Sequence, residues 1–463
     1  MSEERYDLAI MGGGPGGYAA AVMAARHGLK VVLFEAKRLG GTCLNVGCIP
    51  TKYLLHKAAL IAEIRQQTAA GVFKDAGLFS WKKVIAGKDE VVRKLTHGID
   101  GLLASHQVQV VNAAATLTAP GEVTAANRTY KVKDVIIATG SANASLPVPG
   151  SAGADILDST ALLQLERVPA SLTIIGGGVI GLEFASIFAA VGSKVTVVEM
   201  LNALLPGEDR EAVGVLEREL KRAKITFQLG RAVKGISGTM VTLADGTTIT
   251  AEKILVAIGR QPVLAGIDAA KLGLRLTKPG HLQVDSHQET NLPHVYAIGD
   301  VAGGWQLAHA AYAEAEIAMA QILGKPCAVQ LELMPRCIYS LPQLAAVGLT
   351  EEQVRERQIA YQRGVFPLAA SGKALADEAG TGMIKVLSAA SDGRILGVHA
   401  VGAQAAEWLA PALTLMNMKG TVADLATMIF PHPTCSEAFK EAALAGENAS
   451  LHLPRPAKGA RSC

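Results

Sequence analysis

Two cysteines lie five positions apart in a glycine-rich stretch, a spacing that raises the question of redox chemistry. They are Cys43 and Cys48 of GGTCLNVGCIPTK, residues 40–52. In a regular α-helix, five residues advance about 7.5 Å and turn the second side chain about 140° from the first, so the sulfur atoms could not bridge. Gly47 weakens a helix, and the ring of Pro50 clashes with the carbonyl four residues earlier. We therefore expect a break between the cysteines, which would allow a disulfide.

A lysine follows this pair at helical spacing. Lys52 is four residues after Cys48, so its ammonium should share a helix face with that sulfur and favour the thiolate. Six cysteines in 463 residues do not form the disulfide framework of a small secreted protein. In a reducing compartment a close pair is interpreted as catalytic. The other four cysteines are interpreted as ordinary thiols: Cys327, Cys337, Cys435 and Cys463.

An internal repeat supplies the elements that would surround the pair. Residues 7–35 and 171–199 each hold an apolar strand, a glycine turn, an Ala-rich helix, a second apolar strand and a terminal glutamate. A lone GxGxxG motif is a weak signal, but the matching acids, Glu35 and Glu199, favour the βαβ dinucleotide-binding unit. In such a unit a pyrophosphate approaches the helix N-terminus and the acid accepts from a ribose hydroxyl. The glycines of the two turns are Gly12, Gly14 and Gly17, then Gly176, Gly178 and Gly181.

Two such units predict two different dinucleotides. Glu199 is followed by Met200, Leu201 and Asn202, so no arginine stands ready for a 2′-phosphate. Because a carboxylate repels that phosphate, the second site should prefer NAD over NADP. Binding of NADP through basic residues elsewhere in the chain stays open as the alternative.

Composition and charge narrow the class of protein. A length of 463 residues predicts about three domains. The net charge of +3 is too small to indicate a nucleic-acid or membrane partner. No apolar run approaches the roughly 18 residues of a membrane span, and the N-terminal segment lacks the continuous apolar stretch of a secretory signal. The expected location is therefore the cytosol.

Together, these motifs resemble the flavoprotein disulfide reductases, and among them the dihydrolipoamide dehydrogenases. The first βαβ unit, the Cys43–Cys48 stretch and TNLPHVYAIGD at 290–300 carry the resemblance, which covers essentially the whole chain. The resemblance implies FAD at the first dinucleotide site and NAD at the second, with Asp300 bonding the ribityl chain of FAD. The resemblance also implies cofactor contacts at three further residues. They are Gly259 in the family pattern at 256–260, Ala308 in the pattern at 307–315, and Lys52 in the helix after the cysteines.

A second catalytic motif lies near the C-terminus. FPHPTCSEAF, residues 430–439, matches the family pattern HPT-x-S-E. A lone histidine is commonly a plain surface or core residue, but Glu437 could hold the ring of His432 in one tautomer and raise its basicity. The resemblance implies that this histidine acts on the disulfide of the partner subunit, which requires a homodimer.

Glu183 follows the second glycine turn, and its family counterpart pairs with the lysine that matches Lys52. Seen from the residues alone, a solvated helix charge is the alternative. The flanking run LEFASIF is apolar, so an unpaired buried carboxylate would be costly. We expect an ion pair between Glu183 and Lys52.

The implied fold is α/β, with two Rossmann-like dinucleotide-binding domains, one for FAD and one for NAD, and a C-terminal α+β dimerisation domain. Asp-Gly pairs at 245–246 and 392–393 predict hairpins, and the final segment PRPAKGARSC predicts a solvated tail. The expected boundaries are 1–142 for the FAD domain, 143–262 for the NAD domain, 263–333 for a central segment completing the FAD domain, and 334–463 for the interface domain.

The implied activity is oxidation of protein-bound dihydrolipoamide through the Cys43–Cys48 disulfide and FAD, with reduction of NAD to NADH. The implied partner is the lipoyl carrier of a 2-oxo acid dehydrogenase or glycine-cleavage complex. Two alternatives remain: a glutathione- or mercuric-type reductase, and a non-catalytic sensor that binds FAD and NAD. Departures from the family pattern at 340–343 and 113–115 leave local detail open.

Overall fold

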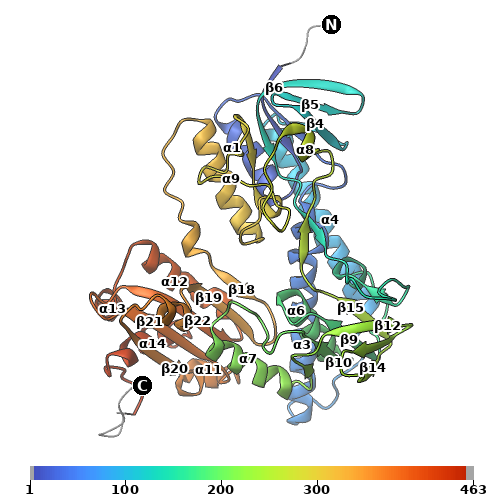
Figure 1. The fold of residues 1–463 in the computed structure, drawn as a ribbon. Helices are drawn as coiled ribbons and strands as arrows, with labels where there is room; N and C mark the ends of the chain where they lie inside the picture. Colours follow the sequence, from blue (N-terminus) through green and yellow to red (C-terminus); the bar gives the residue numbers. More distant parts are fainter. Residues whose placement is uncertain (1–4, 455–463) are drawn as a thin grey trace.

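The computed structural model describes residues 5–454 and divides them around separate β-sheets (Figure 1). Cys463 and the tail predicted at the C-terminus lie outside the described residues, apart from Pro454. The architecture is the predicted α/β fold, with two dinucleotide-binding units and a C-terminal α+β domain. The domain boundaries given above stay predictions.

The first sheet contains the first glycine turn. Strands β3, β2, β1 and β6 are neighbours and run parallel, and β17 pairs with the C-terminal end of β6. The other end of β6 begins an antiparallel run with β5 and β4. β17 thus brings the chain near residue 300 beside a strand formed before residue 140. The strands are β1 (Arg5–Met11), β2 (Val31–Phe34), β3 (Gln109–Val111), β4 (Ala115–Ala119), β5 (Glu122–Ala125), β6 (Arg128–Ile137) and β17 (Val295–Ala297).

Helices cover one face of this sheet and extend beyond it. α1 packs against α9 over the sheet, where both contribute to one apolar core. α3 and α4 pack on each other and run downward to the second sheet, where α3 contacts α6 (Figure 1). The helices of this domain are α1 (Pro15–Arg26), α2 (Gly41–Val46), α3 (Cys48–Ala69), α4 (Trp81–Ser105), α8 (Ala269–Leu272) and α9 (Ala308–Ile322), with a 3₁₀ turn at Gly299–Val301. The short helix α8 packs on the opposite face of the sheet from α1 and α9.

The second sheet repeats the parallel arrangement, in the order β11-β10-β9-β15-β8. A small antiparallel sheet of β12, β13 and β14 flanks it, and β7 pairs with β16 where the chain enters and leaves the domain. The strands are β7 (Ser141–Asn143), β8 (Ile156–Leu157), β9 (Ser171–Ile175), β10 (Lys194–Val198), β11 (Thr226–Gln228), β12 (Val233–Ser237), β13 (Met240–Leu243), β14 (Thr248–Thr250), β15 (Lys253–Val256) and β16 (Arg260–Pro262). The helices are α5 (Ser159–Leu162), α6 (Val179–Val191) and α7 (Arg210–Arg222).

The C-terminal domain is an antiparallel sheet covered by helices, in the order β18-β19-β22-β21-β20. Its apolar residues Ile338, Leu344 and Met383 belong to the same core as α6 and β9, so it packs directly on the second domain. The strands are β18 (Arg336–Ile338), β19 (Gln343–Gly348), β20 (Tyr361–Pro367), β21 (Met383–Ala389) and β22 (Ile395–Gly402). The helices are α10 (Glu351–Glu356), α11 (Gly372–Ala376), α12 (Ala405–Asn417), α13 (Val422–Thr427) and α14 (Glu437–Gly446), with 3₁₀ turns at Leu331–Leu333 and Leu368–Ala370.

Local sequence signals succeed at the turns. Both predicted hairpins are present, β13–β14 around Asp245-Gly246 and β21–β22 around Asp392-Gly393. The predicted break between the cysteines is also present, because α2 ends at Val46 and α3 begins at Cys48. Pro50 agrees with this break. A helix continuing from α2 would press the proline ring against the carbonyl of Val46, the residue at which α2 ends, whereas in the first turn of α3 the missing N–H removes no helical hydrogen bond.

Two glycine-to-alanine substitutions test how tightly the first helix packs. A Cβ at Gly17 in α1 would lie 1.9 Å from the carbonyl oxygen of Gly12, whereas a Cβ at Gly98 in α4 would meet nothing within 4 Å. We expect Gly17→Ala to lower the free energy of unfolding by about 2 kcal/mol or more, and Gly98→Ala to raise it by about 0.5–1 kcal/mol. Urea unfolding followed by circular dichroism measures both. Equal effects of the two substitutions would contradict the packing described.

Candidate active site

Both glycine turns have the conformation that close backbone approach requires. Gly12 has φ +111° and Gly176 has φ +116°, and a Cβ there would lie 2.3 Å from the carbonyl oxygen of Ala138 and 2.2 Å from that of Ala257. The third glycines pack helix against turn instead. A Cβ at Gly181 would lie 2.1 Å from the carbonyl oxygen of Gly176, which repeats the relation of Gly17 to Gly12.

The middle glycines leave room for a ligand. Gly14 and Gly178 are the N-cap residues of α1 and α6. A Cβ at Gly14 would meet nothing closer than 3.9 Å, and one at Gly178 nothing within 4 Å. Each helix N-terminus therefore opens onto free space, which fits the pyrophosphate of a dinucleotide.

The two acids are held in the same way in both units. Glu35 accepts hydrogen bonds from the backbone N–H of Gly13 at 2.8 Å and of Lys37 at 2.7 Å. Glu199 accepts from Gly177 at 2.7 Å and from Leu201 at 2.8 Å. Each carboxylate is thus fixed beside its glycine turn, with lone pairs left to accept from ribose hydroxyls.

One continuous cavity of about 3040 Å³ joins these turns to the dithiol. Gly17 and Gly181, which pack inside the fold, do not line it, and neither do His432 and Glu437. The predicted site residues that line it are Gly12, Gly14, Glu35, Cys43, Cys48, Lys52, Gly176, Gly178, Glu183, Glu199, Gly259, Asp300 and Ala308.

The two thiols meet across the break between α2 and α3. Gly47 permits the approach, because a Cβ there would lie 2.9 Å from the carbonyl oxygen of Thr42 and 3.3 Å from the Cα of Cys43. Both cysteines are free thiols in the structure. The thiol of Cys43 donates to the sulfur of Cys48, which lowers the pKa of Cys48; with help from the Lys52 ammonium, and against burial, that pKa reaches about 7. The same hydrogen bond, together with burial, raises the pKa of Cys43.

The predicted ion pair is present beside the thiols. The Nζ of Lys52 lies 2.9 Å from both carboxylate oxygens of Glu183, whose side chain is 5% exposed. The backbone N–H of Tyr339 also donates to Glu183 at 3.1 Å, and its ring lies under the ammonium, 4.5 Å from Nζ to the centroid. The pair orients the ammonium while its remaining exposed surface faces the cavity.

A polar cluster around Asp300 includes residues that sequence reasoning missed. Ser141 donates to Asp300, and the Nε of Arg260 lies 3.7 Å from the same carboxylate. Arg260 also donates to the carbonyl of Ser141 at 2.8 Å and to the hydroxyl of Thr42, next to Cys43, at 3.4 Å. Arg260 closes the VAIGR pattern at 256–260, which was the signal available for it. This cluster fits the hydroxyl-rich ribityl chain of FAD.

Three further buried or half-buried groups stand near the site: Glu314, inside the family pattern at 307–315, and Cys337 and Tyr339, which belong to none of the motifs. Burial raises the pKa of Glu314 to about 7, although the backbone N–H of Gly299 donates to it. Cys337 and Tyr339 arrive on and after β18 and line the cavity. Burial raises the pKa of Cys337 to about 11, so this thiol stays protonated near neutral pH. Its position on the cavity was not anticipated.

His432 and Glu437 lie apart from the cavity on the C-terminal domain, His432 between α13 and α14 and Glu437 at the first position of α14. The Nδ1 of His432 is 3.0 and 3.2 Å from the two oxygens of Glu437, and the histidine side chain is 78% exposed. Burial would raise the pKa of Glu437, but the backbone N–H of Thr434 and the imidazole hold it below its usual range. Within one chain, the structure therefore does not bring His432 to the dithiol.

Comparison with known proteins agrees with this geometry. The model of the pyridine nucleotide-disulphide oxidoreductase family matches residues 6–315, and that of its dimerisation domain matches residues 334–443. The chain belongs to this family. It is therefore a flavin disulfide oxidoreductase that uses FAD and NAD, and its dimerisation domain supports a homodimer. None of the helices in the described residues combines the length and apolar character needed to cross a bilayer.

Relatives match along almost the entire length of the chain. The dihydrolipoyl dehydrogenase of Thermus scotoductus is 40% identical, covering 97% of this chain and 99% of the relative. That of Bacillus subtilis is 37% identical, covering 96% and 99%. Among solved structures, the HOCl-induced flavoprotein disulfide reductase RclA from Escherichia coli superposes with a TM-score of 0.86 at 30% identity, covering 95% of this chain and 99% of RclA.

The charge environment of Cys48 predicts opposite effects of two substitutions. Lys52 stabilises the thiolate and Glu183 destabilises it. In reduced protein we expect the thiolate of Cys48 to titrate near pH 7, Lys52→Met to shift that titration to higher pH, and Glu183→Gln to lower pH. The pH dependence of alkylation, mapped to Cys48 by mass spectrometry, measures the shift. Lys57→Met is the control, because Lys57 is on the same helix but lies over the ring of Tyr53, and it should leave the titration of Cys48 unchanged. Shifts of equal sign for Lys52→Met and Glu183→Gln would contradict the opposite roles assigned to the two charges.

Proposed function

We propose that this enzyme oxidises dihydrolipoamide on a lipoyl carrier and passes the electrons to NAD. The observation that carries the proposal is the dithiol beside Lys52, on a cavity that runs between the two glycine turns. Dihydrolipoamide is the proposed substrate because relatives that are 37–40% identical over nearly the whole chain are named dihydrolipoyl dehydrogenase. The carrier belongs to a 2-oxo acid dehydrogenase or glycine-cleavage complex, since these present the dithiol on a separate polypeptide.

Each cysteine has a distinct part in the proposed reaction. A substrate thiolate attacks the sulfur of Cys43 in the oxidised pair, the bond between Cys43 and Cys48 breaks, and Cys48 leaves as a thiolate. Its low pKa makes Cys48 the better leaving group of the two. The second substrate thiol then displaces Cys43, so the substrate leaves as a disulfide and both electrons remain on the pair. Bound along the cavity, the flavin supplies the relay of an electron pair from dithiol to nicotinamide.

Lys52 and Glu183 hold the charge that this step creates. The ammonium stabilises the thiolate of Cys48, and the carboxylate fixes the direction of the ammonium. The two dinucleotides would be held by the glycine turns and by five further residues, with Glu35 and Glu199 each accepting from a ribose. The five are Glu35, Glu199, Asp300, Ala308 and Gly259. Because the acid beside the second turn is Glu199 with no neighbouring arginine, NAD is the proposed pyridine nucleotide.

His432 is the proposed base, and it acts on the site of the partner subunit. Glu437 accepts from Nδ1, which leaves Nε2 to take a proton from the substrate thiol. The imidazole is exposed on the domain that matches the family's dimerisation domain. His432 does not line the cavity that contains the dithiol of its own chain. A cytosolic location is part of the proposal, since a catalytic dithiol pair functions in a reducing compartment.

Substrate pairs separate this proposal from its rivals. With purified dimer, we expect initial rates with dihydrolipoamide and NAD to exceed those with glutathione disulfide and NADPH by a factor of about 100 or more, because Glu199 repels a 2′-phosphate. Carrier domains that bear a dihydrolipoyl group should react faster than free dihydrolipoamide. Faster turnover of glutathione disulfide or of mercuric ion would favour those reductases, and absence of all turnover would favour the sensor.

Mixed dimers test whether His432 acts across the subunits. Cys48→Ser and His432→Gln homodimers should each lose most activity, the second by a factor of about 100 or more. A heterodimer of the two chains, isolated through two affinity tags, keeps one site with both groups if the histidine acts on the partner subunit. We then expect about half of the wild-type rate. An inactive heterodimer would mean that each histidine serves its own chain.

A further inference from the structure

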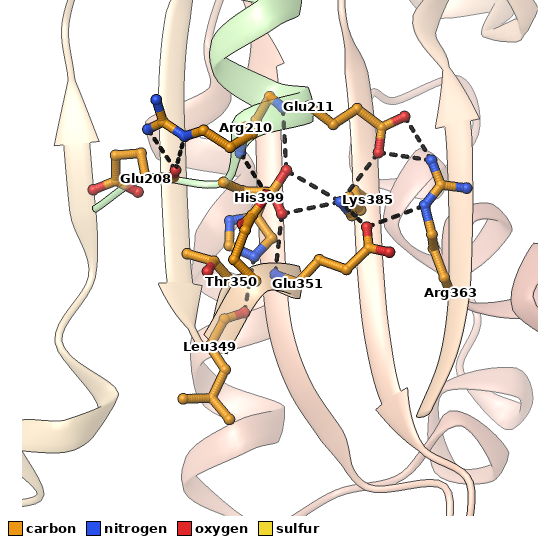
Figure 2. A network of polar contacts seen from close by, with 12 residues as sticks. Glu208, Arg210, Glu211, Leu349, Thr350, Glu351, Arg363, Lys385 and His399 are labelled. Atoms are coloured by element: carbon orange, nitrogen blue, oxygen red, sulfur yellow. Dashed lines mark hydrogen bonds and ion pairs between the residues drawn. The ribbon is translucent and has the colours of Figure 1, made fainter. Parts of the chain in front are cut away.

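A buried cluster of charges joins the second dinucleotide domain to the C-terminal domain (Figure 2). Its centre is Lys385 on β21, which is 1% exposed. The ammonium lies 2.9 Å from Asp209, 3.1 Å from Glu211 and 2.5 Å from Glu351. Asp209 and Glu211 belong to the start of α7 in the second domain, whereas Glu351 begins α10 in the C-terminal domain.

Other groups complete the cluster. Arg363 on β20 lies 2.6 Å from Glu211 and 3.4 Å from Glu351, so it also joins the two domains. His399 on β22 is fully buried and interacts electrostatically with Asp209. Its Nε2 lies 3.0 Å from the carbonyl oxygen of Leu349 (Figure 2). Burial holds the pKa of His399 below its usual value, so the ring is neutral near pH 7. The three carboxylates are thus balanced by Lys385, by Arg363 and by Arg355, which pairs with Glu351, and not by the histidine.

Orientation is what such a cluster can supply. Burying ions is costly, and well-packed apolar residues in their place commonly give equal or greater stability. The same face of α7 already packs through Ala212, Val213 and Leu216. Apolar contacts tolerate small sliding, but hydrogen bonds from one ammonium to three carboxylates are satisfied in a single arrangement. The cluster therefore fixes how the start of α7 sits on the C-terminal sheet.

A short series of hydrogen bonds connects this cluster to the second glycine turn. Asp209 is the N-cap of α7 and accepts from the backbone N–H of Ala212 at 3.2 Å. The next residue, Arg210, donates to the carbonyl oxygens of Leu204, at 3.0 Å, and Leu205. Leu205 in turn donates its backbone N–H to the carbonyl oxygen of Gly177 at 3.2 Å.

The segment between Glu199 and Asp209 therefore runs from the second glycine turn to the charge cluster around Lys385. Met200, Leu201 and Pro206 line the cavity beside the second glycine turn. The dithiol is held by a different contact, the junction of α2 and α3, and no charge of the cluster is among the groups that shift the pKa of Cys48.

We propose that Lys385, through Asp209, is a positioning residue for NAD. It holds the segment 200–206 and the second glycine turn in the geometry that binds the nucleotide, and it has no part in the dithiol half of the reaction. This inference rests on the NAD site and is independent of which dithiol the enzyme oxidises.

The test separates the two halves of the reaction in the holoenzyme. We expect Lys385→Met to raise KM for NADH about tenfold in the reduction of an artificial electron acceptor, and to leave the rate of flavin reduction by a dithiol, without nucleotide, within about twofold of wild type. Lys385→Arg, which keeps the charge, should restore most of the affinity. Asp134→Asn is the matched control, since that buried carboxylate pairs with His294, at 2.8 Å, outside the cavity; its KM should not change.

A double variant keeps the test decisive if Lys385→Met alone fails to fold. Lys385→Met leaves buried carboxylates without their cation, whereas Lys385→Met with Asp209→Asn removes one charge of each sign and retains an N-cap acceptor. This double variant should fold with FAD bound and show the same rise in KM. A KM within about twofold of wild type in either folded variant would overturn the proposal. Equal slowing of both half-reactions would overturn it as well, because it would indicate a general structural role.

Discussion

Contact between two sulfur atoms on separate helices is the constraint on which the site depends. Five residues of continuous helix would turn Cys43 and Cys48 apart, and the break at Gly47 brings them together. A side chain at Gly47 would press on the backbone at Thr42 and Cys43. The glycine is therefore required by packing at the point where the thiols meet, and the remaining structure sets what surrounds them.

The surroundings give two chemically identical side chains different reactivity. The hydrogen bond from Cys43 and the ammonium of Lys52 favour the thiolate at Cys48, while Cys43 remains protonated. Glu183 costs some of this stabilisation through its own charge, yet it is what fixes the ammonium in place. Polar groups thus act at this site through orientation, as the Lys385 cluster is proposed to do between the domains.

Sequence reasoning succeeded wherever the signal was local. The glycine turns, their acids, the two hairpins and the break between the cysteines each depend on a few consecutive residues. Pro50 belongs with these local signals, because a continuous helix would bring its ring against the carbonyl of Val46, where α2 ends. The pair of Lys52 and Glu183 was found through the family resemblance.

Residues that meet the site from distant elements escaped prediction. Cys337 lies on the first strand of the C-terminal sheet and Tyr339 directly follows it, and their approach depends on packing between domains. Lys385 gave no signal either, because it lies in the strand MIKVLSA, where a single lysine is typical of a solvated face. Its burial follows from the position of α7 on the sheet, which the sequence of neither element specifies.

The pairing of the sulfurs can be measured directly by counting thiols. The oxidised enzyme, unfolded without reductant, should expose four of its six thiols to an alkylating reagent, and all six after reduction. Peptide mapping should join Cys43 to Cys48. Six reactive thiols in the oxidised enzyme, or a disulfide between any other cysteines, would contradict the account.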